Sequence, residues 1–217
     1  MRINKYVALA TGMSRRAADQ AISWGRIAVN GLPPVSAGYD VQENDVVTLD
    51  GNELKIQENY TTIILNKPVG YVVSRDGQGS KSIYELLPEA YRVLKPVGRL
   101  DKASSGLLLL TNNGDLANQL THPSYKKDKV YEIELYVPLK TEDKRAIERG
   151  IELEDGISAL KLKGQSTNWT VTMSEGRNRQ IRRTFGALGY TVKKLHRIQF
   201  GEYTLKGTAE GTSRLVG

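Results

Sequence analysis

Residues 97–115 read VGRLDKASSGLLLLTNNGD, a stretch that joins a charged loop to an apolar strand and a turn. The continuous apolar run over 107–111 is typical of a strand that is buried on both faces. Asparagine and glycine at 112–114 predict a turn, and a helical pattern over 115–121 follows it. The loop before the strand carries Asp101, which this arrangement places next to a rigid core.

The chain from residue 61 onward is rich in predicted strands, with a few helices between them. Apolar runs and alternating patterns predict strands over 62–65, 71–74, 107–111, 130–137, 168–173 and 192–198. Helical patterns with end signals occur over 82–87, 115–121, 140–149 and 179–188. Consecutive strands with separate helices favour an α+β fold over a doubly wound parallel sheet.

Residues 1–50 have a different pattern, in which two short helices precede two strands. Ser14 is a good N-cap for the second helix, and Gly25 ends it. Strands are predicted over 27–29 and 46–49, each followed by a tight-turn signal.

Two domains account for these patterns. The chain has 217 residues, 39% of them hydrophobic, which is enough to bury a core. We expect a first domain over 1–58 and a second over 61–217, with the polar stretch 57–60 as a linker.

Basic charge is concentrated in two places. The chain has 31 basic and 24 acidic residues, a net charge of +7, but residues 1–59 contain six basic and seven acidic side chains. Residues 173–197 contain seven basic side chains and one acidic side chain, and residues 1–30 contain five and one. Such grouping indicates a polyanionic partner.

The composition excludes several classes of site. Cysteine is absent, which excludes disulfide scaffolds, thiolate catalysis and iron–sulfur clusters. His122 and His196 have no second ligand nearby in the sequence, so we expect no metal. Neither a membrane span nor a signal peptide is found, which predicts a cytoplasmic protein. We expect Trp24 and Trp169 to lie in the core.

Four motifs of the second domain follow one another along the chain. They are NKPVGYVVS at 66–74, GRLDKASSGLLLLTNNGD at 98–115, KKDKVYEIEL at 126–135 and EGRNRQIRRTFGALGYTVKKLHRIQFG at 175–201. Together they resemble the RsuA family of ribosomal RNA pseudouridine synthases. The resemblance implies a catalytic domain with a mixed, mainly antiparallel sheet and flanking helices. It also implies isomerisation of uridine to pseudouridine in ribosomal RNA without a cofactor.

A carboxylate on a glycine-flanked loop suits nucleophilic or acid–base chemistry. The resemblance implies that Asp101 is the essential carboxylate, that Tyr131 stacks on the extruded base and that Arg182 pairs with Asp101. Arg99 is similar to a family arginine that fills the gap in the RNA stack. The other basic residues expected to contact RNA or shape the pocket are Lys129, Arg177, Arg179 and Arg183.

The sequence MRINKYVALATGMSRRAADQAISWGRIAVNG at 1–31 resembles the alpha-L RNA-binding module first described in a small-subunit ribosomal protein. That resemblance implies that two helices and the following strand grip structured RNA. Its candidate RNA-binding residues are Arg2, Lys5, Arg15, Arg16 and Arg26. The same segment is more similar to family members that act on large-subunit RNA than to the small-subunit enzyme.

Other interpretations stay open at the level of sequence. The chain could modify small-subunit RNA, or it could be a non-catalytic RNA-binding assembly factor with the same fold. An acid–base hydrolase that uses Asp101 with Glu175 or Asp115 has no matching motif. A monomer is the simplest expectation, because no exposed apolar stripe stands out.

Overall fold

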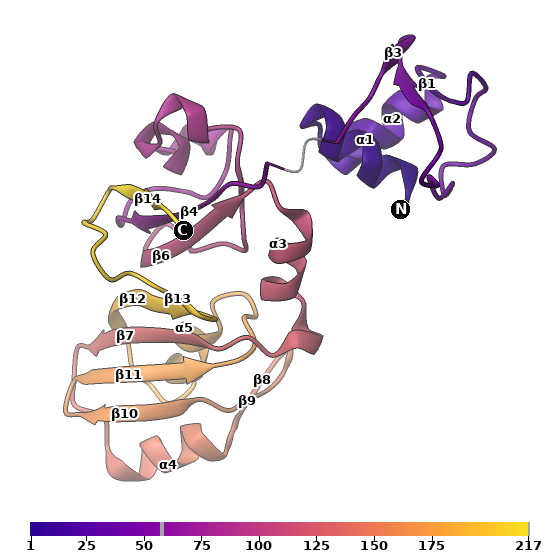
Figure 1. Cartoon of the computed structure of the whole chain (residues 1–217). Coiled ribbons are helices and arrows are strands. Elements are labelled where there is room, and N and C mark those ends of the chain that lie inside the picture. Colours follow the sequence, from indigo (N-terminus) through magenta and orange to yellow (C-terminus); the bar gives the residue numbers. More distant parts are fainter. Residues whose placement is uncertain (57–58, 217) are drawn as a thin grey trace. The chain divides into compact units, whose positions relative to one another are not determined.

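The computed structural model describes residues 1–56 and 59–216 and divides the chain into two units, Met1–Tyr60 and Thr61–Gly217 (Figure 1). Residues 57–58, part of the predicted linker, lie outside the described residues. Each unit has a hydrophobic core of its own.

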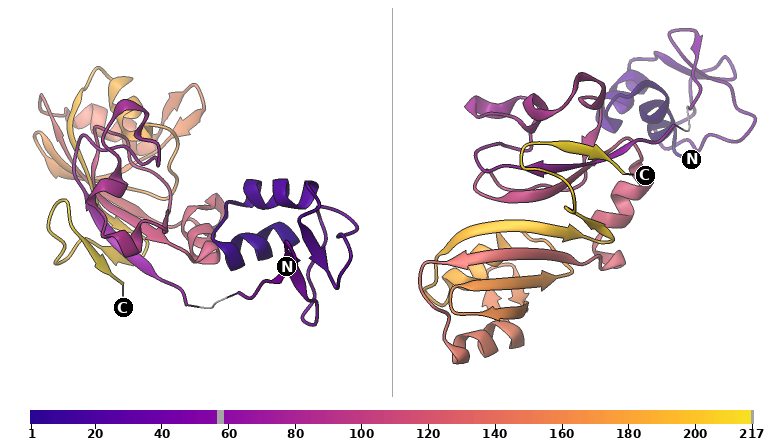
Figure 2. Two further views of the ribbon diagram at one scale, coloured as in Figure 1. Left: turned by 90° about the horizontal axis from the view of Figure 1, so that it is seen from above. Right: turned by 60° about the vertical axis from the view of Figure 1, so that its left-hand side comes forward.

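The first unit consists of two helices and a small antiparallel sheet. Its elements are α1 (Ile3–Thr11), α2 (Arg15–Ser23), β1 (Ile27–Val29), β2 (Val47–Leu49) and β3 (Asn52–Glu53). The helices lie side by side (Figures 1 and 2) and share a core that includes Ile3, Val7 and Ala18. The side chain of Ser14 accepts a hydrogen bond from the N–H of Ala17, as expected for an N-cap.

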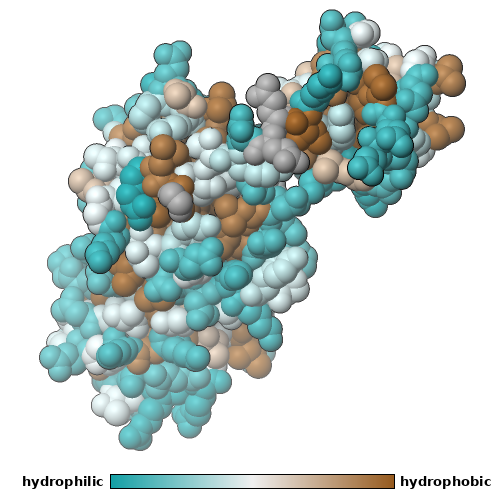
Figure 3. All heavy atoms as spheres, viewed as in Figure 1, coloured by the Kyte–Doolittle hydropathy of each residue, from teal (hydrophilic) through white to brown (hydrophobic). Residues whose placement is uncertain are grey.

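The prediction that both tryptophans lie in the core is wrong for Trp24. Its side chain is 64% exposed, whereas Trp169 is 7% exposed and packs in the core of the second unit. Trp24 is the C-cap of α2 and follows the helical residues Ala18 and Ala21, which are buried. At Gly25 the chain turns away from the helix. Hydrophobic side chains thus reach the surface of the first unit (Figure 3).

The second unit is built around one large sheet. Its strands are β4 (Thr62–Lys67), β5 (Lys95–Pro96), β6 (Ser105–Thr111), β7 (Lys129–Leu135), β10 (Lys161–Gln165), β11 (Asn168–Met173), β12 (Val192–Phe200), β13 (Tyr203–Thr204) and β14 (Ser213–Leu215). A separate hairpin consists of β8 (Ile151–Leu153) and β9 (Gly156–Ser158). The helices are α3 (Gly114–Thr121), α4 (Thr141–Arg149) and α5 (Gln180–Gly186).

The sheet is mixed and mainly antiparallel, and the predicted α+β class is confirmed. Its strand order is β10-β11-β7-β12-β6-β4-β14, with β13 beside β12 and β5 beside β6. Among the described strands, the pairing of β12 with β6 is parallel and the other pairings are antiparallel. Because β12 lies between β7 and β6 in this order, residues of these three strands lie close together.

Strand β6 is buried on both faces, as its apolar run predicts. Leu108 and Leu110 belong to a core that α5 covers, whereas Leu107 and Leu109 belong to a second core that α3 covers. Because successive strand residues point to opposite faces, one apolar run serves two cores.

Three local predictions need correction. Residues 71–74 form no strand: they follow a turn at Gly70, whose φ is 94°, and Val72 makes only an isolated bridge with Ser82. The helix predicted over 82–87 is a 3₁₀ helix, Ile83–Leu86, that Ser82 caps. The helix predicted from residue 179 begins one residue later, because Arg179 has a left-handed backbone.

Candidate active site

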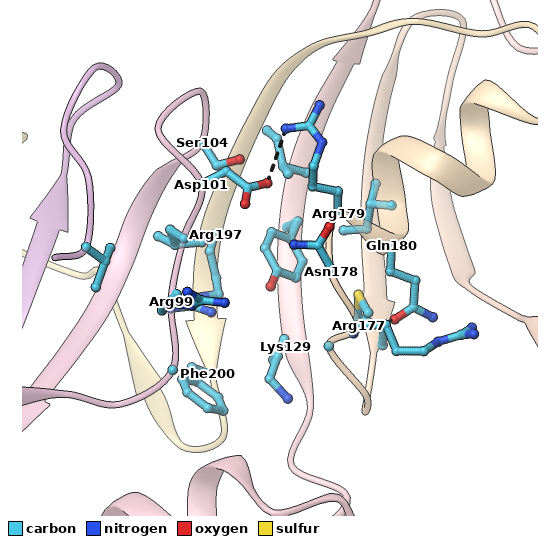
Figure 4. A pocket seen from close by; sticks show the side chains of 18 of the residues that line it. Arg99, Asp101, Ser104, Lys129, Arg177, Asn178, Arg179, Gln180, Arg197 and Phe200 are labelled. Carbon is cyan, nitrogen blue, oxygen red and sulfur yellow. Dashed lines mark hydrogen bonds and ion pairs between the residues drawn. The ribbon is translucent and has the colours of Figure 1, made fainter. Parts of the chain in front are cut away.

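The second unit contains an open cavity of about 720 Å³. The loop of Asp101 lines one part of it, and residues 174–181 line another. Strands β7 and β12 contribute Tyr131 and Leu195 to the lining. Figure 4 shows Asp101 and Arg179 near each other, away from the part that contains Lys129 and Phe200.

Asp101 lies in the loop between β5 and β6, as predicted. The N–H of Ser104 donates to its carbonyl at 3.0 Å and closes the loop. Its side chain is 35% exposed and lines the cavity. The loop thus holds the backbone of Asp101 and leaves the carboxylate accessible to a ligand.

Lys67, at the end of β4, supports this loop from the interior. Its side chain is fully buried, and Nζ donates to the carbonyls of Pro68, Asp101 and Ser104 at 3.0, 3.2 and 2.7 Å. Burial lowers the pKa of Lys67 to about 8, and the charge of Asp101 opposes this shift. The sequence analysis assigned no role to Lys67, although a lysine shortly after the apolar run 63–65 was a visible signal.

Arg179 forms an ion pair with Asp101, and the pairing of Arg182 with Asp101 stays a prediction. Burial, and then the charge of Arg179, lower the pKa of Arg182, whereas the charge of Asp101 opposes this shift. Arg179 Nη1 lies 3.6 Å from Asp101 Oδ2 (Figure 4). Arg182 donates to the carbonyls of Val192 and Ala103, at 2.6 and 2.9 Å, and so links α5 to the loop of Asp101. The predicted helix included Arg179, whereas its φ of 49° places it before α5, outside the helical spacing that would put it on one face with Arg182.

Tyr131 lines the cavity from β7 and is 7% exposed. It is paired with Arg197 on β12 and with Val171 on β11, in the middle of the sheet. A tyrosine fixed in this way offers a rigid aromatic surface, and its stacking on a base stays a prediction.

A group of two cations and one aromatic ring lies in another part of the cavity. Lys129 Nζ is 4.9 Å from the centre of the Phe200 ring, and Arg197 Cζ is 5.0 Å from it. Burial, and then the charge of Arg197, lower the pKa of Lys129. Arg197 is 2% exposed and donates through Nε to the carbonyl of Leu107. Sequence reasoning counted Arg197 only as part of the basic stretch.

Two predicted RNA-binding arginines are engaged within the protein. Arg177 and Arg183 both form ion pairs with Asp155, at 2.8 and 2.6 Å. A guanidinium bound to a carboxylate has fewer donors left for phosphate. Arg177 lines the cavity, and contact of either arginine with RNA stays a prediction. Arg99 is exposed and lines the cavity, where it can meet a ligand.

The predicted basic residues of the first unit do not form one group. Arg2, Lys5 and Arg15 line a common surface pocket, and Arg16 is exposed. Arg26 is different, because its guanidinium donates to both oxygens of Asp50 and lowers the pKa of that carboxyl. Arg26 is thus a partner of Asp50, and its contact with RNA stays a prediction.

Three further features concern the described part of the chain. No group of three or more histidine, aspartate or glutamate side chains there could hold a metal ion. The helices there are too short or too polar to cross a bilayer. His196 Nδ1 lies 2.9 Å from Ser105 Oγ, a contact within the sheet.

A sequence model of the RNA pseudouridylate synthases matches residues 61–187. A solved structure described as a pseudouridylate synthase has a TM-score of 0.72 and 30% identity, and the alignment covers 100% of this chain and 96% of that one.

Curated relatives match almost the whole chain. An uncharacterized RNA pseudouridine synthase of Aquifex aeolicus is 40% identical over 99% of this chain and 89% of its own length. Ribosomal large subunit pseudouridine synthase B of Bacillus subtilis is 37% identical, over 98% and 91%. A dual-specificity RNA pseudouridine synthase of Escherichia coli is 34% identical, over 99% and 74%.

Proposed function

The chain belongs to the RNA pseudouridine synthase family, and we propose that its substrate is a uridine of large-subunit ribosomal RNA. The reaction breaks the bond between N1 of uracil and C1′ of ribose and forms a bond between C5 and C1′. The C5 proton leaves and N1 gains a proton, so no atom is lost overall. The name of the Bacillus relative supports the choice of large-subunit RNA.

The observation that carries this function is the position of Asp101. Its carboxylate lines the cavity, Arg179 faces it, and Tyr131 lines the same cavity. The cavity volume of about 720 Å³ suits a nucleotide-sized ligand. We assign Asp101 as the essential carboxylate, with Arg179 as the cation that orients it.

The target uridine must leave its stack to enter this cavity. Extrusion of a base costs a few kcal/mol. Stacking on an aromatic side chain such as Tyr131 contributes roughly 1–3 kcal/mol per base. In this proposal Arg99 occupies the space that the uridine leaves in the RNA and Lys129 contacts the RNA backbone, which their position in the cavity lining supports.

The first unit supplies affinity for RNA in this proposal. Arg2, Lys5 and Arg15 share one surface pocket, and Arg16 adds charge close by in the sequence. Such a cluster suits phosphate oxygens. The protein acts as a cytoplasmic monomer without a cofactor.

A pseudouridine map of both ribosomal RNAs, from cells with and without the gene, tests the substrate. We expect one large-subunit site to disappear and to return with the wild-type gene but not with Asp101→Asn. Loss of a site in small-subunit RNA alone, or no lost site, would contradict the proposal.

A further inference from the structure

Arg179 has a backbone conformation that few residues other than glycine adopt. Its φ is 49° and its ψ is 30°, directly before α5. A residue with a Cβ is disfavoured there, so the conformation persists only where surrounding contacts hold it. Figure 4 shows that Arg179 points toward Asp101, whereas Arg177 points away from it.

The arginines on both sides of Arg179 bind the β8–β9 hairpin, and the carboxylate of Asp155, between the two strands, accepts from both. Arg177 also donates to the carbonyls of Gly156 and Ile157 and to Glu175. Arg177 Nη1 donates to Asp155 Oδ1 at 2.8 Å and to the Asp155 carbonyl at 2.7 Å. Arg183 donates to both carboxylate oxygens of Asp155, at 3.0 and 2.6 Å. Arg183 Nε also donates to the carbonyl of Asn178, the residue before Arg179, at 2.9 Å.

A buried set of hydrogen bonds fixes the same hairpin against α5. Gln180 Nε2 donates to Ser158 Oγ at 3.0 Å, and the Ser158 and Thr184 hydroxyls lie 2.8 Å apart. The Gln180 side-chain carbonyl accepts from the N–H of Arg177 at 3.1 Å. These three polar side chains are buried, so the hairpin that carries Asp155 has a defined position.

We propose that Asp155 is a positioning residue for the reaction. By holding Arg177 and Arg183, it keeps Arg179 in the left-handed conformation that faces Asp101. Asp155 is not among the described residues that line the cavity, so it acts through the arginines and does not touch the substrate. The inference rests on the proposed role of Asp101.

Asp155 suits a mutational test because its removal leaves the core intact. Its side chain is 42% exposed, and exposed ion pairs contribute little to stability. Glu134 offers a matched control, because it pairs with Lys193 at 2.6 Å and is 34% exposed in the same unit.

The test uses the full chain and a large-subunit ribosomal RNA transcript that carries tritium at C5 of uridine. Tritium release under single-turnover conditions reports formation of the new carbon–carbon bond. We expect Asp155→Ala to slow the maximal rate by roughly tenfold to a hundredfold, because small displacements of a catalytic group have effects of this size. The half-saturating RNA concentration should change by less than about threefold. Asp155→Glu should restore most of the rate, and Glu134→Ala should leave it unchanged.

A double-mutant cycle shows whether the effect passes through Arg179. If it does, adding Asp155→Ala to Arg179→Ala causes no further loss, because the two substitutions remove the same interaction. An unchanged rate in Asp155→Ala, a loss confined to the half-saturating concentration, or independent effects of the two substitutions would overturn the inference. A wild-type protein that releases no tritium from this RNA would instead contradict the proposed substrate.

Discussion

Asp101 is held mainly through its backbone. Its carbonyl accepts hydrogen bonds from Lys67 and from the N–H of Ser104, whereas its carboxylate faces Arg179 across 3.6 Å. The partly exposed ion pair contributes at most about 1 kcal/mol to stability. Chemistry and folding therefore depend on different atoms of the same residue.

This separation predicts the behaviour of Asp101→Asn. We expect the rate of pseudouridine formation to fall by at least about a hundredfold, because the amide can neither attack nor exchange a proton as a carboxylate does. RNA affinity, measured by filter binding, should stay within about threefold. Asp115→Asn is a suitable control from the same motif, since Asp115 is absent from the described cavity lining, and it should keep full activity. A near wild-type rate in Asp101→Asn would show that another group carries the reaction.

Lys67 predicts a pH dependence of stability. Its pKa in the folded protein is about 8, below its ordinary value of 10.5, so between these pH values the unfolded chain binds more protons. The free energy of unfolding that depends on Lys67 should therefore rise with pH, by about 2 kcal/mol between pH 8 and pH 10.

Urea unfolding of the wild type and of Lys67→Met at pH 7, 8, 9 and 10 measures this effect. The other titrating groups are common to both proteins and cancel in the difference. We expect the difference in unfolding free energy to be flat below pH 8 and to shift in favour of the wild type above it. A difference that is constant from pH 7 to pH 10 would mean that Lys67 keeps its ordinary pKa.

At the scale of elements, the parallel contact between β6 and β12 brings the Asp101 loop near the strand of Arg197. Gly106 is paired with Arg197, and its φ is 103°. A Cβ on Gly106 would lie 2.2 Å from the Arg197 carbonyl oxygen, far inside van der Waals contact. Only glycine therefore permits this approach.

Gly106→Ala should lower the free energy of unfolding by about 3 kcal/mol or more, because the neighbouring atoms are backbone. In a unit of this size, that loss lowers Tm by about 6–12 °C. Gly114→Ala, in the first turn of α3 with open space around the added methyl, should leave Tm unchanged or slightly higher. Thermal unfolding followed by circular dichroism distinguishes the two variants, and equal Tm values would refute the argument from close approach.

At the scale of the whole molecule, charge and chemistry are divided between two units. The second unit contains the cavity, the basic stretch over residues 173–197 and the net positive charge of the chain. The first unit is close to neutral but groups Arg2, Lys5 and Arg15 around one surface pocket. Each unit has its own hydrophobic core, so removal of the first should leave the second folded.

We expect residues 61–217 alone to bind the ribosomal RNA transcript more weakly than the full chain. The slope of log affinity against log salt should become less steep by about 0.9 for each phosphate contact that is lost. The full chain with Arg2, Lys5 and Arg15 each changed to alanine should show part of the same effect. Equal affinity and equal slope for the truncated and full chains would mean that the first unit does not grip RNA.

The sequence by itself determined the features that depend on neighbours along the chain. The apolar run of β6, the N-cap Ser14, the turn at residues 112–114 and the loop position of Asp101 follow from local periodicity and turn chemistry. The four motifs indicated the family for the same reason, because they are patterns of adjacent residues.

Only the tertiary structure decided which distant side chains meet. The family resemblance implied Arg182 as the partner of Asp101, and the structure adds Arg179, whose left-handed backbone precedes α5 and whose guanidinium lies 3.6 Å from the Asp101 carboxylate. The burial of Lys67 and the capture of two arginines by Asp155 likewise depend on strands and turns far apart in sequence. Periodicity describes the direction of a side chain relative to its own element. Its partner is set by the packing of elements against one another, which no local pattern encodes.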